Sequence, residues 1–182
     1  MKCSEYYNVR GEFKDGDMAI FRGHSLLAKS IIYFDSAYYN HVGMLKWINS
    51  RLFIVEMWSE GIQFIPLSRR MKGYDNFCVA RVKDKTQEEF LSAIDCLLEK
   101  IERDMKYDYL LLPRIAFYKK TGIDLVGLGK RNRFICSELA QSFTNSLGVD
   151  CYKDVSLITP QDFLRKKDDN EVEILYDFSP KV

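Results

Sequence analysis

Cys136, His41 and Glu56 are residue types that together support nucleophilic acyl-transfer chemistry. A cysteine nucleophile needs a base, normally a histidine, and the histidine benefits from a polar group that fixes its tautomer and orientation. Such a set attacks a carbonyl, forms a thioester with the acyl group and releases it to water. The chemistry requires a fold that brings the three residues together.

Cys136 lies at the start of a predicted helix, directly after a short apolar segment. From Cys136 to Leu147 the apolar residues recur at helical spacing, and Gly148 is typical of a C-terminal cap. A cysteine in the first helical turn lies near the positive end of the dipole and near unpaired backbone N–H groups, which favour the thiolate. The alternative is a small buried hydrophobe on the inner face of the helix.

His41 and Glu56 lie on two neighbouring predicted strands, 41–47 and 52–58. Glu56 is the only carboxylate of an otherwise apolar strand. A buried carboxylate is costly unless it is paired, so we expect Glu56 to have a partner. A lone histidine in a strand is often structural, and this alternative remains open for His41.

The turn at residues 49–50 determines whether His41 and Glu56 can meet. If Asn-Ser forms a two-residue turn, Ile48 faces Arg51, and Glu56 lies one step diagonal to His41 on the same face. Such diagonal residues are ~7–8 Å apart between Cα atoms, within reach of a long side chain. A register shifted by one residue would place them on opposite faces. The spacing permits the pair without requiring it.

The remaining pattern predicts an α+β protein with an antiparallel sheet of about five or six strands. Tight turns within 41–67 indicate a meander of three strands. The further expected strands are 18–21, 77–82 and 172–176, and the expected helices are 26–34, 86–106, 136–147 and 159–164. The 86–106 helix has a capping box and an unbroken apolar stripe, which indicate a packing role.

Residues 108–130 are expected to form a mobile border of the site, immediately before Cys136. Pro113 interrupts an apolar segment, one helical turn is expected at 115–118, and 121–129 is rich in glycine.

Composition predicts one soluble domain over residues 1–182, with a core of about 14–178. The net charge of +1 argues against a nucleic-acid partner, and five widely spaced cysteines without a C-x-x-C pair argue against disulfides or structural zinc. The N-terminus lacks the apolar run of a signal peptide, and no stretch approaches the ~18 apolar residues of a membrane span. We therefore expect a cytoplasmic protein without an integral membrane segment.

Several sequence blocks together resemble a known family. They are Gly16-Asp17, Asn40-His41-Val42-Gly43-Met44, Ile54-Val55-Glu56, Phe134-Ile135-Cys136-Ser137-Glu138-Leu139 and Leu157-Ile158-Thr159-Pro160. In this order the chain resembles the circularly permuted branch of the NlpC-type papain-like hydrolases, the YiiX-like or YaeF-like group, in which the histidine precedes the cysteine. The resemblance implies a papain-like antiparallel sheet or barrel packed against helices. It also implies Cys136 as nucleophile, His41 as base and Glu56 as the orienting residue.

The same resemblance implies a thiol hydrolase that cleaves an amide, such as a peptide or cell-wall peptide bond, without a metal or cofactor. Two alternatives remain: a lipid ester or thioester hydrolase or acyltransferase of the same fold, and a non-catalytic binding module with an unreactive Cys136. The expected partner is thus a peptide or an acyl-chain substrate. The chain lacks the Asn-Cys-Glu-His motif and the hydrophobic anchor of the lecithin:retinol acyltransferase-like proteins.

Overall fold

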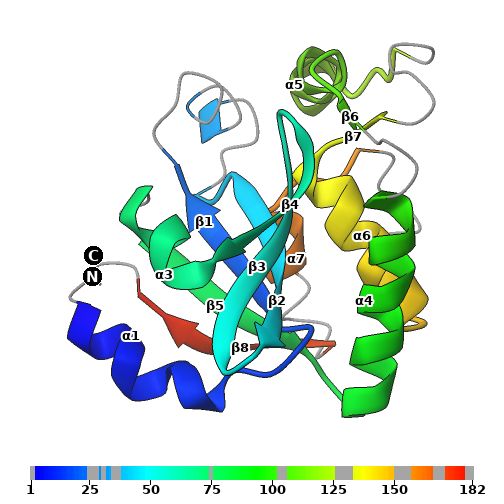
Figure 1. Cartoon of the computed structure of the whole chain (residues 1–182). Helices are drawn as coiled ribbons and strands as arrows, with labels where there is room; N and C mark the ends of the chain where they lie inside the picture. Colours follow the sequence, from blue (N-terminus) through cyan, green and yellow to red (C-terminus); the bar gives the residue numbers. More distant parts are fainter. Residues whose placement is uncertain are drawn as a thin grey trace.

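A six-stranded antiparallel sheet forms the centre of the protein (Figure 1). The computed structural model describes residues 3–23, 29, 32–33, 38–73, 76–101, 106–125, 133–149, 157–165 and 171–178. The strand order is β4-β3-β2-β1-β5-β8. The strands are β1 (Met18–Arg22), β2 (His41–Ile48), β3 (Arg51–Trp58), β4 (Gly61–Pro66), β5 (Asn76–Val82) and β8 (Val172–Asp177). The predicted α+β class and antiparallel sheet are confirmed.

The β2–β3 hairpin has the predicted register. Asn49 and Ser50 have φ angles of 47° and 60°, and two left-handed residues are what a type I′ turn requires. Ile48 pairs with Arg51 as expected. His41 and Glu56 therefore point to the same face of the sheet.

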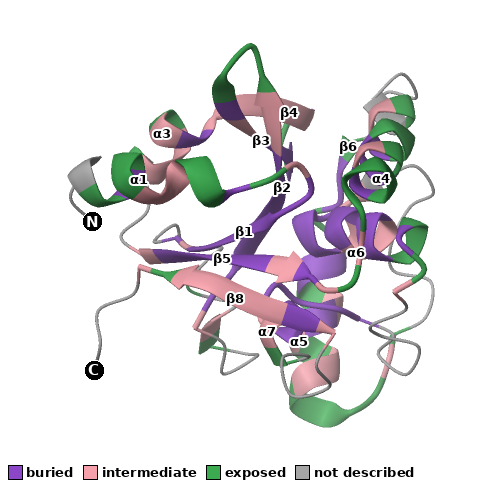
Figure 2. Ribbon diagram, turned by 90° about the horizontal axis from the view of Figure 1, so that it is seen from below, coloured by how far each residue is buried: buried purple, intermediate pink, exposed green. Residues whose placement is uncertain are grey.

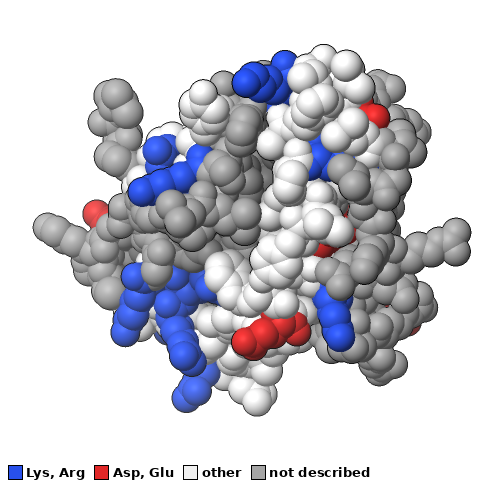
Figure 3. All heavy atoms as spheres, turned by 90° about the horizontal axis from the view of Figure 1, so that it is seen from above, with Lys and Arg blue, Asp and Glu red and all other residues white. Residues whose placement is uncertain are grey.

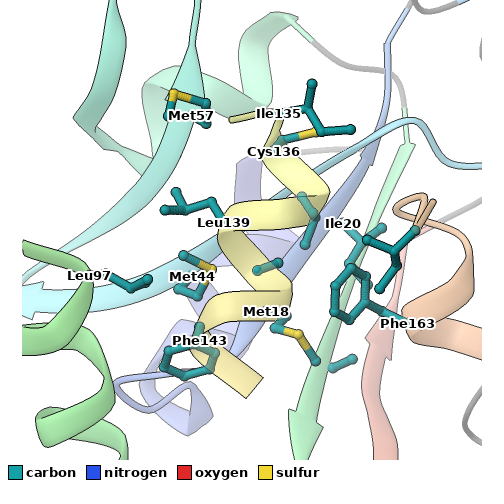
Figure 4. Close-up of a cluster of buried hydrophobic side chains, with 14 of the residues drawn as sticks. Met18, Ile20, Met44, Met57, Leu97, Ile135, Cys136, Leu139, Phe143 and Phe163 are labelled. Atoms are coloured by element: carbon teal, nitrogen blue, oxygen red, sulfur yellow. The ribbon is translucent and has the colours of Figure 1, made fainter. Parts of the chain in front are cut away.

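Two long helices, α4 (Gln87–Ile101) and α6 (Cys136–Ser146), lie side by side against one face of the sheet (Figures 1 and 2). Both were predicted from their apolar stripes, and Gly148 ends the second helix with a φ of 70°. Figure 4 shows the core between this helix pair and the sheet. It includes Met18, Ile20, Val42, Met44, Met57, Leu97, Leu139 and Phe143.

The opposite face of the sheet has its own core, covered by α1 (Cys3–Val9) and α3 (Leu67–Arg70). The core side chains include Tyr6, Phe13, Phe21, Leu45, Ile54, Leu67 and Phe77. No helix was predicted before residue 18, so α1 is an element that the sequence did not indicate. Only tertiary packing reveals this helix, because it is anchored by Tyr6, which is buried against the sheet. The short 3-10 helices η1 (Arg10–Glu12) and η2 (Met71–Gly73) follow α1 and α3.

Residues 111–121 form a complete helix, α5 (Leu111–Thr121), where only one helical turn was expected. Pro113 is its third residue, and a proline in the first turn removes no intrahelical hydrogen bond. Gly122 ends the helix with a φ of 72°. Before it, β6 (Lys106–Tyr107) pairs in parallel with β7 (Arg133–Phe134), which leads into α6.

The last helix, α7 (Asp162–Arg165), begins later than predicted. The Thr159 N–H and hydroxyl both donate to the Asp162 carboxylate, at 2.8 and 2.9 Å. Residues 159–161 therefore form a turn that leads into α7. The helix expected at 26–34 and the loop residues 126–132 lie largely outside the described residues.

Candidate active site

His41 and Glu56 form a buried hydrogen-bonded pair. His41 Nε2 lies 2.6 Å from Glu56 Oε2, and the residues are 6% and 0% exposed. A carboxylate only accepts, so Nε2 carries the hydrogen, and Nδ1 is the ring nitrogen that can take up a proton. The predicted partner of Glu56 is thus present, and it is the candidate base.

The close approach of β2 and β3 beside this pair requires a glycine. A Cβ at Gly43 would lie 2.6 Å from the Ile54 Cγ1 atom and 2.8 Å from the Val55 carbonyl oxygen. A side chain cannot occupy this space without moving the backbone of the neighbouring strand. The absence of a side chain lets the strands pack tightly next to the pair.

Arg70 and Trp58 complete the surroundings of the pair. The Arg70 guanidinium forms an ion pair with Oε1 of Glu56, the oxygen that His41 does not use. Arg70 also lies over the Trp58 ring, 4.6 Å from its centroid, and Trp58 meets the His41 ring at 5.3 Å and 89°. The sequence analysis missed Arg70, since a buried carboxylate indicates a cation without saying which one.

The chain entering β2 is held by two amide side chains. The Asn40 amide accepts from the Gly23 N–H at 2.9 Å and donates to the Gly23 carbonyl at 3.1 Å. The Gln161 side-chain oxygen accepts from the N–H groups of Tyr38 and Tyr39, at 3.0 and 3.2 Å. These contacts fix the position at which His41 begins its strand.

Cys136 is the first residue of α6 and is 4% exposed. The helix start is held by Glu138, which accepts from the Ile135 N–H at 3.0 Å, and by Ser137, whose hydroxyl donates to the Ile158 carbonyl at 2.8 Å. The segment 157–162 therefore contacts both the start of α6 and, through its glutamine, the chain entering β2.

Glu138 titrates near neutrality. Burial raises the pKa of its carboxyl to about 7, and the nearby Asp108 also raises it, against the hydrogen bond from the Ile135 N–H. The helix start that carries Cys136 therefore has a capping group whose charge changes at physiological pH.

A small apolar recess adjoins Cys136. Leu112 and Ile115 of α5 line it from one side, and Ile158 and Pro160 from another. The two lining hydroxyls have partners of their own: Ser137 donates to a carbonyl and Thr159 to Asp162. Of the expected border 108–130, Leu112 and Ile115 thus lie beside Cys136, and residues 126–130 lie outside the described residues.

Strand alternation assigns His41 and Cys136 to different faces of the sheet. His41 pairs with Phe21, which belongs to the core under α1 and α3, whereas Val42 packs in the core with Cys136. Both residues begin their elements, β2 and α6. Among the described residues, the Cys136 thiol forms no hydrogen bond to His41 or Glu56. The structure brings His41 and Glu56 together and leaves the thiol without a bond to them.

Other groups with reactive potential are less suited to chemistry. Cys78 is buried, and burial raises its thiol pKa to about 12, while Cys96 is exposed. Within the described ranges, no group of three or more His, Cys, Asp and Glu side chains is placed to hold a metal ion. No described helix is long and apolar enough to cross a membrane.

Neither the models of known protein families nor the curated proteins match this chain. Its fold is similar to a solved structure described as the metalloprotein yiiX from Escherichia coli O157:H7. The identity is 17% and the TM-score 0.61, over 92% of this chain and 98% of that chain. At this identity the likeness shows the fold alone, an α+β architecture of the yiiX type.

Proposed function

We propose that the protein is a cysteine hydrolase that cleaves an amide bond through a thioester. Cys136 is the nucleophile, His41 the base and Glu56 the residue that orients the imidazole. The observation that carries the proposal is the buried 2.6 Å contact between His41 Nε2 and Glu56 Oε2. It leaves Nδ1 as the proton acceptor, as a cysteine hydrolase requires.

In the proposed reaction the Cys136 sulfur attacks the substrate carbonyl carbon while its proton passes to His41 Nδ1. The carbonyl oxygen gains negative charge, and the backbone N–H of Cys136 at the start of α6 is a candidate donor to it. His41 then gives the proton to the leaving amine. Water, deprotonated by the same nitrogen, hydrolyses the thioester and regenerates the thiol.

The mechanism requires the thiol and the imidazole to come within ~3–4 Å in the substrate complex, since catalytic contacts are often looser before substrate binds. Each residue is the first of its element, so the reaction requires substrate binding to bring the Cys136 thiol to Nδ1 of His41 while Nε2 stays on Glu56. The segment 157–162 links the two regions, because Gln161 accepts a hydrogen bond from the chain entering β2 and the Ile158 carbonyl accepts one from Ser137, the residue after Cys136.

A second candidate is the hydrolysis of an acyl ester or thioester of a lipid. The recess at Cys136 is apolar, and α5, which lines it, carries exposed apolar side chains on its outer side and flanks. These are Tyr109, Leu110, Phe117, Ile123 and Leu125. Figure 3, seen from above Figure 1, where α5 lies, shows a band of uncharged side chains beside lysines and arginines. An apolar acyl group suits this surface better than a charged peptide does.

The test compares dipeptide anilides with p-nitrophenyl esters of rising chain length. Cys136→Ala is expected to abolish turnover of the preferred class without loss of folding, His41→Ala to do nearly the same, and Glu56→Gln to cost less because a hydrogen-bond acceptor remains. Full activity in Cys136→Ala would eliminate the proposal. Preference for long-chain esters over anilides would select the second candidate.

Alkylation separates an enzyme from a binding module of the same fold. In a Cys96→Ser background, which removes the exposed thiol among the three cysteines whose side chains the structure describes, iodoacetamide at neutral pH is expected to modify Cys136 before Cys78. Mass spectrometry of digested protein locates the modification. If Cys136 reacts only after unfolding, it is an unreactive core residue and the chain is a binding module.

A further inference from the structure

Arg70 contacts the proposed catalytic residues but has no role in the proposed mechanism. It is the last residue of α3, packed on the sheet face that carries His41 and Glu56. Its guanidinium pairs with Glu56 and lies over Trp58. We propose that Arg70 is a positioning residue that holds Glu56 toward His41 and balances its charge, keeping His41 neutral and able to accept a proton. The catalytic meaning of this role rests on the proposed function.

The two oxygens of Glu56 have different partners, and this division orients the carboxylate. Oε1 pairs with Arg70, while Oε2 lies 2.6 Å from His41 Nε2. The carboxylate is fully buried, so neither oxygen is in contact with bulk water. With one oxygen held by a planar guanidinium, the other is fixed in direction and receives the imidazole N–H.

Trp58 supports both ends of this arrangement. Its ring carries the Arg70 guanidinium 4.6 Å above its centroid and meets the His41 ring edge-on at 5.3 Å. A guanidinium over an indole is favourable by itself, most of all when it is removed from water. The Arg70 side chain is only 13% exposed. The stacking on Trp58 is therefore largely removed from water and helps to hold the guanidinium beside Glu56.

The charges explain why a cation is needed here. With neutral His41, the buried charges of Glu56 and Arg70 cancel. Without Arg70, an uncompensated buried carboxylate would draw a proton onto His41 and make it an imidazolium. Among the described residues, the two aromatic rings that contact the His41 ring, Phe21 of β1 and Trp58 of β3, carry no charge. An imidazolium cannot take the thiol proton, so losing Arg70 would raise the pH above which His41 can act as the base.

The direct test is the titration of His41 by NMR. The chain has two histidines, so His24→Gln leaves one imidazole signal to follow. In that background, Arg70→Gln is expected to raise the His41 pKa by about one unit or more. Arg69→Gln is the matched control, since Arg69 is the preceding residue of α3 and is exposed. It should leave the His41 pKa within about 0.3 units of the unsubstituted value, as screened surface charges do.

Two further variants separate charge from structure. Arg70→Lys retains the cation and is expected to keep the His41 pKa nearer to that of the background protein than Arg70→Gln does. Glu56→Gln with Arg70→Gln removes both buried charges and is expected to lower the His41 pKa below that of Arg70→Gln alone. If Arg70→Gln fails to fold, the double variant compared with Glu56→Gln alone still measures the effect of Arg70.

The outcomes are distinct from those of the proposed function. If Arg70→Gln and Arg69→Gln leave His41 with the same pKa, Arg70 does not act on the imidazole and the inference is wrong. The titration needs no turnover, so an inactive wild-type protein would overturn the hydrolase proposal and leave this result intact. Where turnover is measurable, the acid limb of its pH profile should move to higher pH in Arg70→Gln and be partly restored in Arg70→Lys.

Discussion

Glu138 should make the stability of the protein depend on pH near neutrality, and Glu138→Gln should remove that dependence. In the folded protein burial raises the pKa of this carboxyl to about 7 from its ordinary value of 4.5. A raised pKa means that the folded state favours the protonated form. The stabilisation is therefore fully present below pH 4.5 and is lost as pH rises through 7.

The magnitude follows from the difference between the folded and unfolded pKa values. The rise from 4.5 to about 7 corresponds to at most about 3 kcal/mol at 1.36 kcal/mol per unit, reduced by solvent at this half-buried side chain. Glutamine keeps an oxygen that accepts from the Ile135 N–H but does not ionise. Glu138→Gln should therefore gain stability relative to wild type as pH rises from 4.5 to 8.

The assay is urea unfolding of both proteins across this range, followed by circular dichroism. Taking the difference between variant and wild type cancels the titration of all other groups. Glu89→Gln is the matched control, because Glu89 has the same capping position on α4 and is exposed. Hydrogen bonds from Thr86 lower the pKa of Glu89, so Glu89 affects the pH dependence of stability only below pH 4.5. Above that pH, the difference in the free energy of unfolding between Glu89→Gln and wild type should be constant. A flat difference for Glu138→Gln as well would refute the reasoning.

Two further predictions concern packing. Leu97→Ala on α4 should lower the free energy of unfolding by roughly 2–5 kcal/mol, because Leu97 is fully buried. The folded fraction should keep its specific activity. Reduced activity in folded protein would contradict the packing role of Leu97. Gly43→Ala should destabilise by about 1–3 kcal/mol, because the new methyl would press on Ile54 and the β3 backbone, whereas Gly11→Ala, at an open position, should be nearly neutral in the same denaturation assay.

The register of the β2–β3 hairpin could be predicted from the sequence on one condition, that Asn49 and Ser50 form a two-residue turn, and the structure meets this condition. Asn49 and Ser50 both adopt left-handed angles, and a turn of fixed length leaves one pairing for the strands beside it. The local sequence also predicted α4 and α6, because the apolar stripe of each helix matches its period. This register permits the His41–Glu56 pair, and the structure shows that the pair forms.

Tertiary structure alone decided the features that depend on contacts between distant segments. Nothing local distinguishes Arg70 from Arg69, and only the packing of α3 on the sheet turns one of them toward Glu56. The helix α1 exists because Tyr6 is buried against the sheet, which its own polar sequence does not indicate. The sequence placed Cys136 at a helix start, but its position relative to His41 depends on how α6 crosses the sheet, and that geometry is set by the whole core.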